Sequence, residues 1–189
     1  MKATELLKSQ HREVEKLFKQ IEKASEGDEK RELFEELAKN LVAHDAIERE
    51  IFYPACEEQM GMTELLGEAL VEHGVVEFSL YQADQALGEE DFEYKCTVLE
   101  EVVEHHVKEE EKEFFPKVQK AFEKEELETL GSRMEAAFEA AKAKDFRGPL
   151  HRNLKQVLAG ALKPGANGHS ARRSSRKKTG KRAASSRAH

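Results

Sequence analysis

A 62-residue repeat is the feature that most constrains how this chain folds. The stretch from His44 to Pro54 reads HDAIEREIFYP, and the stretch from His106 to Pro116 reads HVKEEEKEFFP. In both, a Glu follows the His by four residues, a Phe follows the Glu by four, and a Pro closes the segment. Correspondence at a fixed offset predicts that the chain folds as two similar halves.

The same offset also relates the segments that precede each copy. It takes His11 to His73 and Glu15 to Glu77, so each half carries two HxxxE pairs. Residues four apart in sequence lie on one face of an α-helix. We therefore interpret each half as a helical hairpin with one such pair on each helix.

Helical periodicity runs from about residue 4 to residue 144, and no segment shows the alternation of a strand. Pro54 and Pro116 lie late in two of the predicted helices, and we expect each to kink its helix or to end its regular part. Short loops between long helices favour an all-α, up-down antiparallel four-helix bundle with an additional C-terminal helix. The predicted helices span 3–25, 29–58, 63–87, 91–122 and 124–144.

Three regions follow from this pattern. Residues 1–146 are expected to form the bundle and its fifth helix, and 147–162 a short helix or linker. Residues 163–189 hold nine Lys or Arg and no acidic residue, while the rest of the chain has 22 basic and 38 acidic residues. With almost no large apolar side chain, this basic tail is expected to be disordered.

Several functional classes do not fit the sequence. No apolar run approaches the roughly 20 residues that span a bilayer, and the charged N-terminus lacks the apolar core of a signal peptide. Cys56 and Cys96 form no CxxC pair, so we interpret them as free thiols. These features predict a cytoplasmic protein without a membrane partner.

The HxxxE pairs interrupt apolar helix faces. In the second predicted helix, His44 and Glu48 fall on one stripe with Leu41 and Phe52. A buried carboxylate without a partner is costly. The pattern therefore calls for a partner that makes the burial favourable.

Hairpin geometry brings the four histidines to one level. Residues equidistant from a tight turn lie side by side in an antiparallel pair. His11 and His44 are equidistant from the first predicted turn, and His73 and His106 are equidistant from the turn between the helices predicted at 63–87 and 91–122. One layer of the bundle should therefore collect imidazoles and carboxylates from all four helices, as metal sites in bundles do.

The donors in this layer are too many for one ion, and paired carboxylates can bridge two. Imidazole and carboxylate without thiolate suit Fe, Mn or Zn better than Ca or Cu(I). Glu15 and Glu77 either join the centre or accept a hydrogen bond from an imidazole N–H beside it. Tyr53 and Tyr81 are alternatives as phenolate ligands. The predicted metal ligands are His11, His44, Glu48, His73, His106 and Glu110, with Glu15 and Glu77 as weaker candidates.

The segments HREVEKLF, HDAIEREIFYP, EHGVVEFSLYQ and HHVKEEEKEFFP resemble the hemerythrin-like (HHE cation-binding) domain family over about residues 3–144. The resemblance implies a four-helix bundle around a non-haem centre of two Fe ions, oxo- or carboxylate-bridged, with Mn or Zn fitting less well. It implies the same six ligands, the two Glu being the bridges.

Two departures from the oxygen-carrying hemerythrins argue against simple reversible O2 transport. Those proteins have a second His four residues after the third-helix His, where this chain has Glu77. They also separate the last His from its acid by five residues, whereas His106 and Glu110 are four apart. His105 would restore the spacing, but the repeat selects His106.

The resemblance implies a protein that binds or reacts with O2, H2O2 or NO, in oxygen or redox sensing, oxidative or nitrosative stress response, or iron handling. One alternative is a di-iron peroxidase, a catalase-like enzyme or an enzyme that repairs iron centres. Another is a metal-binding protein that residues 163–189 tether non-specifically to nucleic acid. The motif set offers no obvious general acid distinct from the ligands, so the sequence leaves catalysis open.

Overall fold

The computed structural model describes residues 1–25 and 27–160, so the basic tail predicted at 163–189 lies outside the described residues. Within the described part, all regular elements are helical. None of these helices is both long and apolar enough to cross a membrane. In chain order they are α1 (Ala3–Lys23), α2 (Asp28–Ile47), η1 (Glu48–Phe52), α3 (Tyr53–Met60), α4 (Glu64–Gln85), α5 (Phe92–Glu109), η2 (Glu110–Phe114), α6 (Phe115–Ala121), α7 (Lys124–Lys142) and α8 (Arg147–Leu158).

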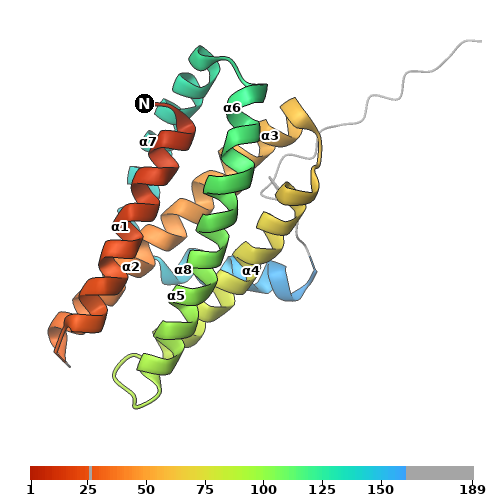
Figure 1. Ribbon diagram of the computed structural model, residues 1–189. Coiled ribbons are helices and arrows are strands. Elements are labelled where there is room, and N and C mark those ends of the chain that lie inside the picture. Colours follow the sequence, from red (N-terminus) through yellow and green to blue (C-terminus); the bar gives the residue numbers. More distant parts are fainter. Residues whose placement is uncertain (26, 161–189) are drawn as a thin grey trace, which may run out of the picture.

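Four long helical segments run up and down as an antiparallel bundle (Figure 1). They are α1, α2 continued through η1 and α3, α4, and α5 continued through η2 and α6; α1 packs against α2, and α4 packs against α5. The arrangement confirms the predicted all-α up-down bundle with an additional helix.

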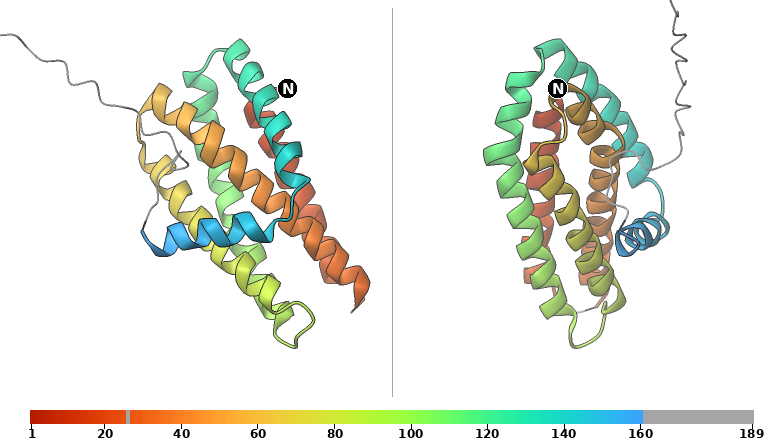
Figure 2. Two further views of the ribbon diagram at one scale, coloured as in Figure 1. Left: turned by 180° about the vertical axis from the view of Figure 1, so that it is seen from behind. Right: turned by 90° about the vertical axis from the view of Figure 1, so that its right-hand side faces the viewer.

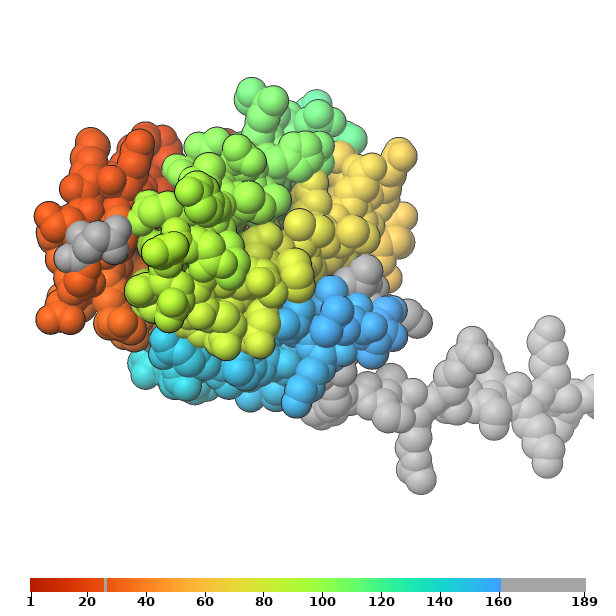
Figure 3. Space-filling model, turned by 90° about the horizontal axis from the view of Figure 1, so that it is seen from below, coloured from red at the N-terminus to blue at the C-terminus, as the bar shows by residue number. Residues whose placement is uncertain are grey.

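Two further helices cover the bundle. Helix α7 packs along α1 and α2, while α8 packs on α4. Figure 2 shows α8 running across the long axis of the bundle, in contrast to α7. Viewed from below, α8 lies on the flank of the molecule next to α4 (Figure 3).

The segments η1 and η2 are π-helical, and they occupy equivalent places in the two halves. Each lies directly before a helix that carries Pro54 or Pro116 in its first turn. A proline has no N–H to donate and its ring clashes with the carbonyl four residues earlier, so a wider turn accommodates it. The prolines thus interrupt the regular α-geometry, as predicted, without ending the helix.

The wider turns bring consecutive aromatic residues into the interior. Phe52 and Tyr53 are both 0% exposed, and Phe114 and Phe115 are both buried. Ring centroids of Phe52 and Phe114 lie 6.1 Å apart, in an edge-to-face arrangement. These rings pack together on one side of the layer that contains the His and Glu residues of the HxxxE pairs.

The apolar core is divided into two clusters. One lies around Phe52 and Phe114 and includes residues of α7, and the other lies around Phe34 and Phe92 near the hairpin turns. Along each long helix the polar layer separates residues of the first cluster from residues of the second. The larger buried polar side chains of this layer are Gln10, His11, His44, Asp45, Glu48, His73, Glu77, His106 and Glu110.

Close packing of α7 on the start of α1 depends on Gly131. A Cβ atom at this position would lie 2.3 Å from the carbonyl oxygen of Met1 and 2.9 Å from the backbone nitrogen of Ala3. Only a residue without a side chain allows this approach. Ala3 is itself 0% exposed, so the contact anchors the first turn of α1.

Candidate metal centre

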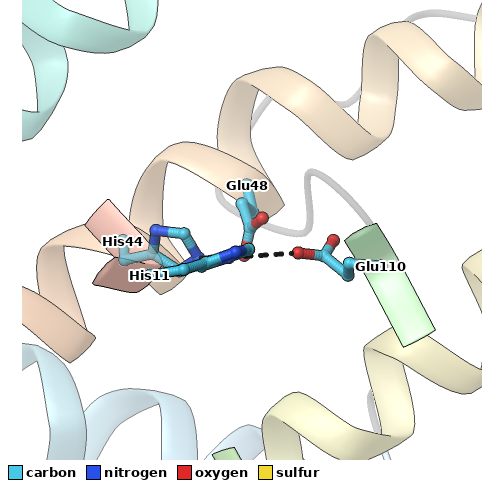
Figure 4. Close-up of side chains that lie close together, drawn as sticks. All are labelled: His11, His44, Glu48 and Glu110. Carbon is cyan, nitrogen blue, oxygen red and sulfur yellow. Dashed lines mark hydrogen bonds and ion pairs between the residues drawn. The ribbon is translucent and has the colours of Figure 1, made fainter. Parts of the chain in front are cut away.

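The first group of converging side chains consists of His11 on α1, His44 on α2, Glu48 on η1 and Glu110 on η2 (Figure 4). Nε2 of His11 lies 3.3 Å from Nε2 of His44 and 3.4 Å from Oε2 of Glu110. Nε2 of His44 lies 3.2 Å from Oε2 of Glu48. Two imidazoles and two carboxylates therefore present one atom each to the same point.

The second half of the chain supplies a matching group. Nε2 of His73 lies 3.1 Å from Nε2 of His106 and 3.2 Å from Oε2 of Glu48. Nε2 of His106 lies 3.8 Å from Oε2 of Glu110. The structure thus brings together all six principal ligand candidates, with both Glu residues between the two histidine pairs.

The charge state of Glu48 tests whether a cation suits this place. Burial disfavours its carboxylate, but the charges of His44 and His73 outweigh burial and hold the Glu48 pKa well below its usual value. Glu48 is 0% exposed, and neither of its oxygens has a well-formed hydrogen bond within the described residues. The same holds for Oε2 of Glu110. Buried anionic oxygens that lack donors fit metal ions, which bind such oxygens directly.

Each of the four imidazoles has a second contact that fixes its orientation. In the first half, Nδ1 of His44 donates to Oε1 of Gln10 at 2.7 Å, and Nδ1 of His11 donates to Oε1 of Glu111 at 2.9 Å. A proton on Nδ1 leaves the Nε2 lone pair of a neutral imidazole free for a metal. These contacts therefore prepare the ring atoms that face the centre.

The second half uses two carboxylates for the same purpose. Nδ1 of His73 donates to Oδ1 of Asp45 at 2.5 Å, and Nδ1 of His106 donates to Oε2 of Glu72 at 2.9 Å. A carboxylate acceptor raises the basicity of the imidazole it holds. The sequence prediction missed these acceptors, although Gln10 lies 62 residues before Glu72 and so belongs to the same repeat.

Tyr53 also lies in the centre. Its hydroxyl donates to Oε1 of Glu110 at 3.0 Å and lies 2.9 Å from Nε2 of His73. Burial and the charges of Glu110 and Glu48 raise the Tyr53 pKa well above its usual value. Its oxygen is thus placed at the second histidine pair, as the phenolate alternative requires, while Tyr81 is half-buried and packs against His151 on α8.

The phenol breaks the symmetry of the two halves. The residue 62 positions after Tyr53 is Phe115, which stacks on His11 with ring centroids 5.9 Å apart and 9° between the planes. His11 and His73 are themselves related by the same offset. Equivalent positions therefore supply a hydroxyl at one histidine pair and only an aromatic face at the other.

Two histidines have strongly raised pKa values. Burial disfavours the imidazolium of His11, but hydrogen bonds to Glu110 and Glu111 outweigh it and raise its pKa to about 9. Burial of His73 is likewise outweighed by Asp45 and Glu48, and its pKa is raised to about 10. In the metal-free protein these protons compensate the buried carboxylates.

The weaker ligand candidates lie outside the cluster. Glu15 is exposed and pairs with Lys19 on the surface of α1. Glu77 is buried, and its Oε2 lies 3.1 Å from Nη2 of Arg49. Burial and the negative charge of Asp45 outweigh the charge of Arg49 and raise the Glu77 pKa to about 8.

His105 lies outside the centre, next to His106. Its side chain is 62% exposed, and its Nε2 lies 3.2 Å from Glu72 and 3.4 Å from Glu109. His106 turns inward instead, as the repeat predicts. Cys56 and Cys96 are buried free thiols, and burial raises the pKa of Cys96 to about 12.

A cavity of about 40 Å³ adjoins the histidines of the centre. A space of roughly 10–15 Å³ is enough to hold one water molecule. All four histidines of the centre line this cavity, and Asp45 and Glu77 form part of its wall. The remaining lining is aliphatic and comprises Val14, Leu41, Val42, Val76, Leu80, Val103 and Val107.

Residues 2–118 match the family model described as the Hemerythrin HHE cation binding domain. A crystal structure of a hemerythrin HHE cation binding domain-containing protein from Mycobacterium kansasii is similar to this chain, with a TM-score of 0.67 and 27% sequence identity. The alignment covers 85% of this chain and 94% of that one. Curated protein sequences gave no match.

Proposed function

Because this chain belongs to the hemerythrin HHE cation-binding domain family, we propose that its buried centre holds two iron ions and binds or reacts with O2, H2O2 or NO. The observation that carries the proposal is the pair of dihistidine groups that share Glu48 and Glu110 next to an apolar cavity. Sensing, stress response and iron handling are all roles that such a centre supports.

Each ion would have its own pair of imidazoles. His11 and His44 would hold the first, and His73 and His106 the second. Glu48 and Glu110 would serve both ions, and Tyr53 would add an oxygen donor at the second. Bound iron would supply a change of oxidation state and an open coordination position.

The chain itself sets which ligands reach the centre. Apart from the histidines, Asp45 and Glu77, the side chains that line the cavity are aliphatic. Its volume of about 40 Å³ suits a molecule of two or a few atoms. O2, NO and H2O2 are of this size.

A pair of cavity substitutions tests this proposal. Val76 lines the cavity, whereas its neighbour Val75 is 47% exposed. Val76→Phe should fill the cavity and reduce NO binding to the anaerobic, ferrous-loaded protein, while the iron content stays unchanged. Val75→Phe adds the same ring at the surface and should bind NO as the wild type does. Equal NO binding by both variants would contradict the assignment of the cavity.

Peroxide turnover is a second candidate function, and Glu77 favours it. This carboxyl group lines the cavity, is not in the ligand cluster and has a pKa raised to about 8. Near neutral pH it therefore retains a proton that it can give to a ligand in the cavity. Glu77 would thus act as a general acid distinct from the six principal ligands.

Turnover of H2O2 should then depend on Glu77 separately from metal binding. We expect Glu77→Gln to retain two irons and lose most of the turnover, whereas His106→Ala should lose both. Glu15→Gln is the matched control, since Glu15 is the repeat equivalent of Glu77 but lies on the surface. Undiminished turnover in Glu77→Gln would remove the proton-donor role.

The basic tail supports a third, accessory function. Residues 163–189 carry nine basic and no acidic residues, beside a body with 22 basic and 38 acidic residues. Such a segment binds nucleic acid through phosphates, without sequence preference and with strong salt dependence. Removing 163–189 should abolish DNA binding at low salt; binding that persists in the shortened protein would exclude the tail as the contact.

A further inference from the structure

Helix α8 lies beyond the residues 2–118 that match the family model, yet it reaches the polar layer. Nδ2 of Asn153 donates to Oδ2 of Asp45 at 3.0 Å. The other oxygen of Asp45 accepts from Nδ1 of His73 at 2.5 Å. Two hydrogen bonds in series therefore connect α8 to a side chain of the candidate metal centre.

The position of Asn153 is set by firm docking of α8. Leu150 is 0% exposed, and Leu154 packs on the same side of the helix. Nη2 of Arg147 lies 2.9 Å from Oδ1 of Asp84 on α4, which anchors the first turn of α8. Asn153 is thus presented to Asp45 by a packed helix and not by a loop.

The two oxygens of Asp45 have different tasks. Oδ1 accepts from His73 and also from Nε of Arg49 at 2.7 Å, while Oδ2 accepts from Asn153. Loss of the Asn153 donor would leave part of a buried carboxylate unpaired, at a substantial cost in free energy. The carboxylate would rotate or shift to recover a donor, and the His73 ring would follow.

This dependence on α8 is confined to one of the four imidazoles. The Nδ1 acceptors of His11, His44 and His106 are Glu111, Gln10 and Glu72. These acceptors belong to η2, α1 and α4 of the bundle itself.

We propose that Asn153 is a positioning residue for the metal site of His73 and His106: it fixes the carboxylate of Asp45 and through it the orientation and basicity of His73. The proposal rests on the proposed function, in which His73 is a ligand. It gives α8 a role in metal binding and predicts that the affinity for one ion depends on this helix more than the affinity for the other.

Titration of the metal-free protein with Fe2+ under anaerobic conditions, in competition with a chromophoric chelator, tests the proposal. Asn153→Leu keeps the size of the side chain and removes the donor. Its affinity for one of the two ions should fall about 10-fold, the low end of the roughly 10- to 100-fold range for outer partners of a ligand. The other affinity should stay within about twofold. His151→Ala, at an exposed position on the same helix, is the control.

A spectroscopic measurement separates positioning from a general loss of stability. In the ferric-loaded protein, the visible absorption of a Tyr53 phenolate reports on the second ion only, and Asn153→Leu should shift it whereas His151→Ala should not. Unchanged affinities and absorption in Asn153→Leu would overturn the proposal. An equal fall in both affinities would overturn it too, because the effect would then be global.

Nuclear magnetic resonance of the metal-free protein distinguishes failure of this proposal from failure of the proposed function. If wild-type protein binds fewer than two ions, the proposed function fails. The Nδ1 proton of His73 should still change its chemical shift in Asn153→Leu and keep it in His151→Ala. An unchanged shift in Asn153→Leu would show that Asn153 does not position His73 at all.

Discussion

The hydroxyl of Tyr53 lies 2.9 Å from Nε2 of His73, at the point where the two halves of the chain cease to be equivalent. The corresponding pair in the other half is Phe115 and His11, which only stack. The two histidine pairs therefore differ at this repeat position by one hydroxyl group. This difference offers a way to observe one position at a time.

Replacing Tyr53 tests that asymmetry. We expect ferric-loaded Tyr53→Phe to retain two irons and to lose the visible charge-transfer absorption of a phenolate. Tyr81→Phe is the matched control, since Tyr81 packs against α8 and lies outside the centre. If Tyr53→Phe and the wild type have the same visible spectrum, the phenol is not a ligand.

The shared carboxylates should matter to both ions at once. Glu48→Gln keeps the shape of the side chain but removes the charge that both histidine pairs contact at 3.2 Å. Both affinities should fall by more than the roughly 10- to 100-fold expected for loss of an outer partner. Isothermal titration with Fe2+ measures this, with Glu57→Gln on the exposed face of α3 as control. Loss of a single ion would contradict the shared role of Glu48.

Stability of the metal-free protein should depend on pH through His11 and His73. Their pKa values are raised to about 9 and about 10 from an ordinary value of 6.5, so the folded state binds these protons more tightly than the unfolded state. Their stabilising contribution is complete below about pH 6.5 and is lost as the pH rises through 9 to 10. The free energy of unfolding should therefore fall between pH 6.5 and pH 10.

Urea unfolding at several pH values measures this effect. The His73→Gln variant lacks one of the two protons, so its stability should fall less steeply over the same range. Acidification acts through other groups. The pKa of Glu48 is lowered, so its carboxylate stabilises the fold at pH values above the ordinary pKa of a Glu side chain. This contribution is lost as the pH falls through the lowered pKa of the folded state. Parallel alkaline curves for wild type and His73→Gln would contradict the assignment.

Packing of α7 gives a prediction about the fold alone. Gly131→Ala places a methyl group against the backbone of residues 1–3 and should destabilise the protein by about 1–3 kcal/mol. Gly67→Ala is the control, because nothing lies within 4 Å of its Cβ position. Replacing a helical Gly that lacks such a contact with Ala should stabilise the protein by about 0.5–1 kcal/mol. In thermal unfolding, the melting temperature should fall in Gly131→Ala and rise in Gly67→Ala.

The fold and the central cluster could be predicted because they depend on periodicity. An offset of 62 residues selects His106 over His105, and equal distance from a turn brings His11 beside His44. Both arguments concern the backbone of regular helices, for which sequence spacing translates directly into position. The structure places these side chains accordingly.

The surroundings of the cluster were harder to predict, because they depend on how neighbouring helices rotate against each other. Glu15 and Glu77 are equivalent in sequence, but one is exposed and the other is buried beside Arg49. The acceptors Gln10 and Glu72 each act on a histidine of the next helix. The presence of Pro54 predicted an irregular helical turn. It did not predict that this turn directs Tyr53 toward the centre.

The iron content of the purified chain tests the central claim most directly. Elemental analysis of the protein loaded anaerobically with Fe2+ and freed of excess metal should give about two irons per chain. The combined variant His11→Ala and His73→Ala, which loses one imidazole from each pair, should give none. Two irons per wild-type chain that disappear in this variant would support a two-metal centre in the polar layer. A wild-type chain that folds fully and retains no iron would contradict it.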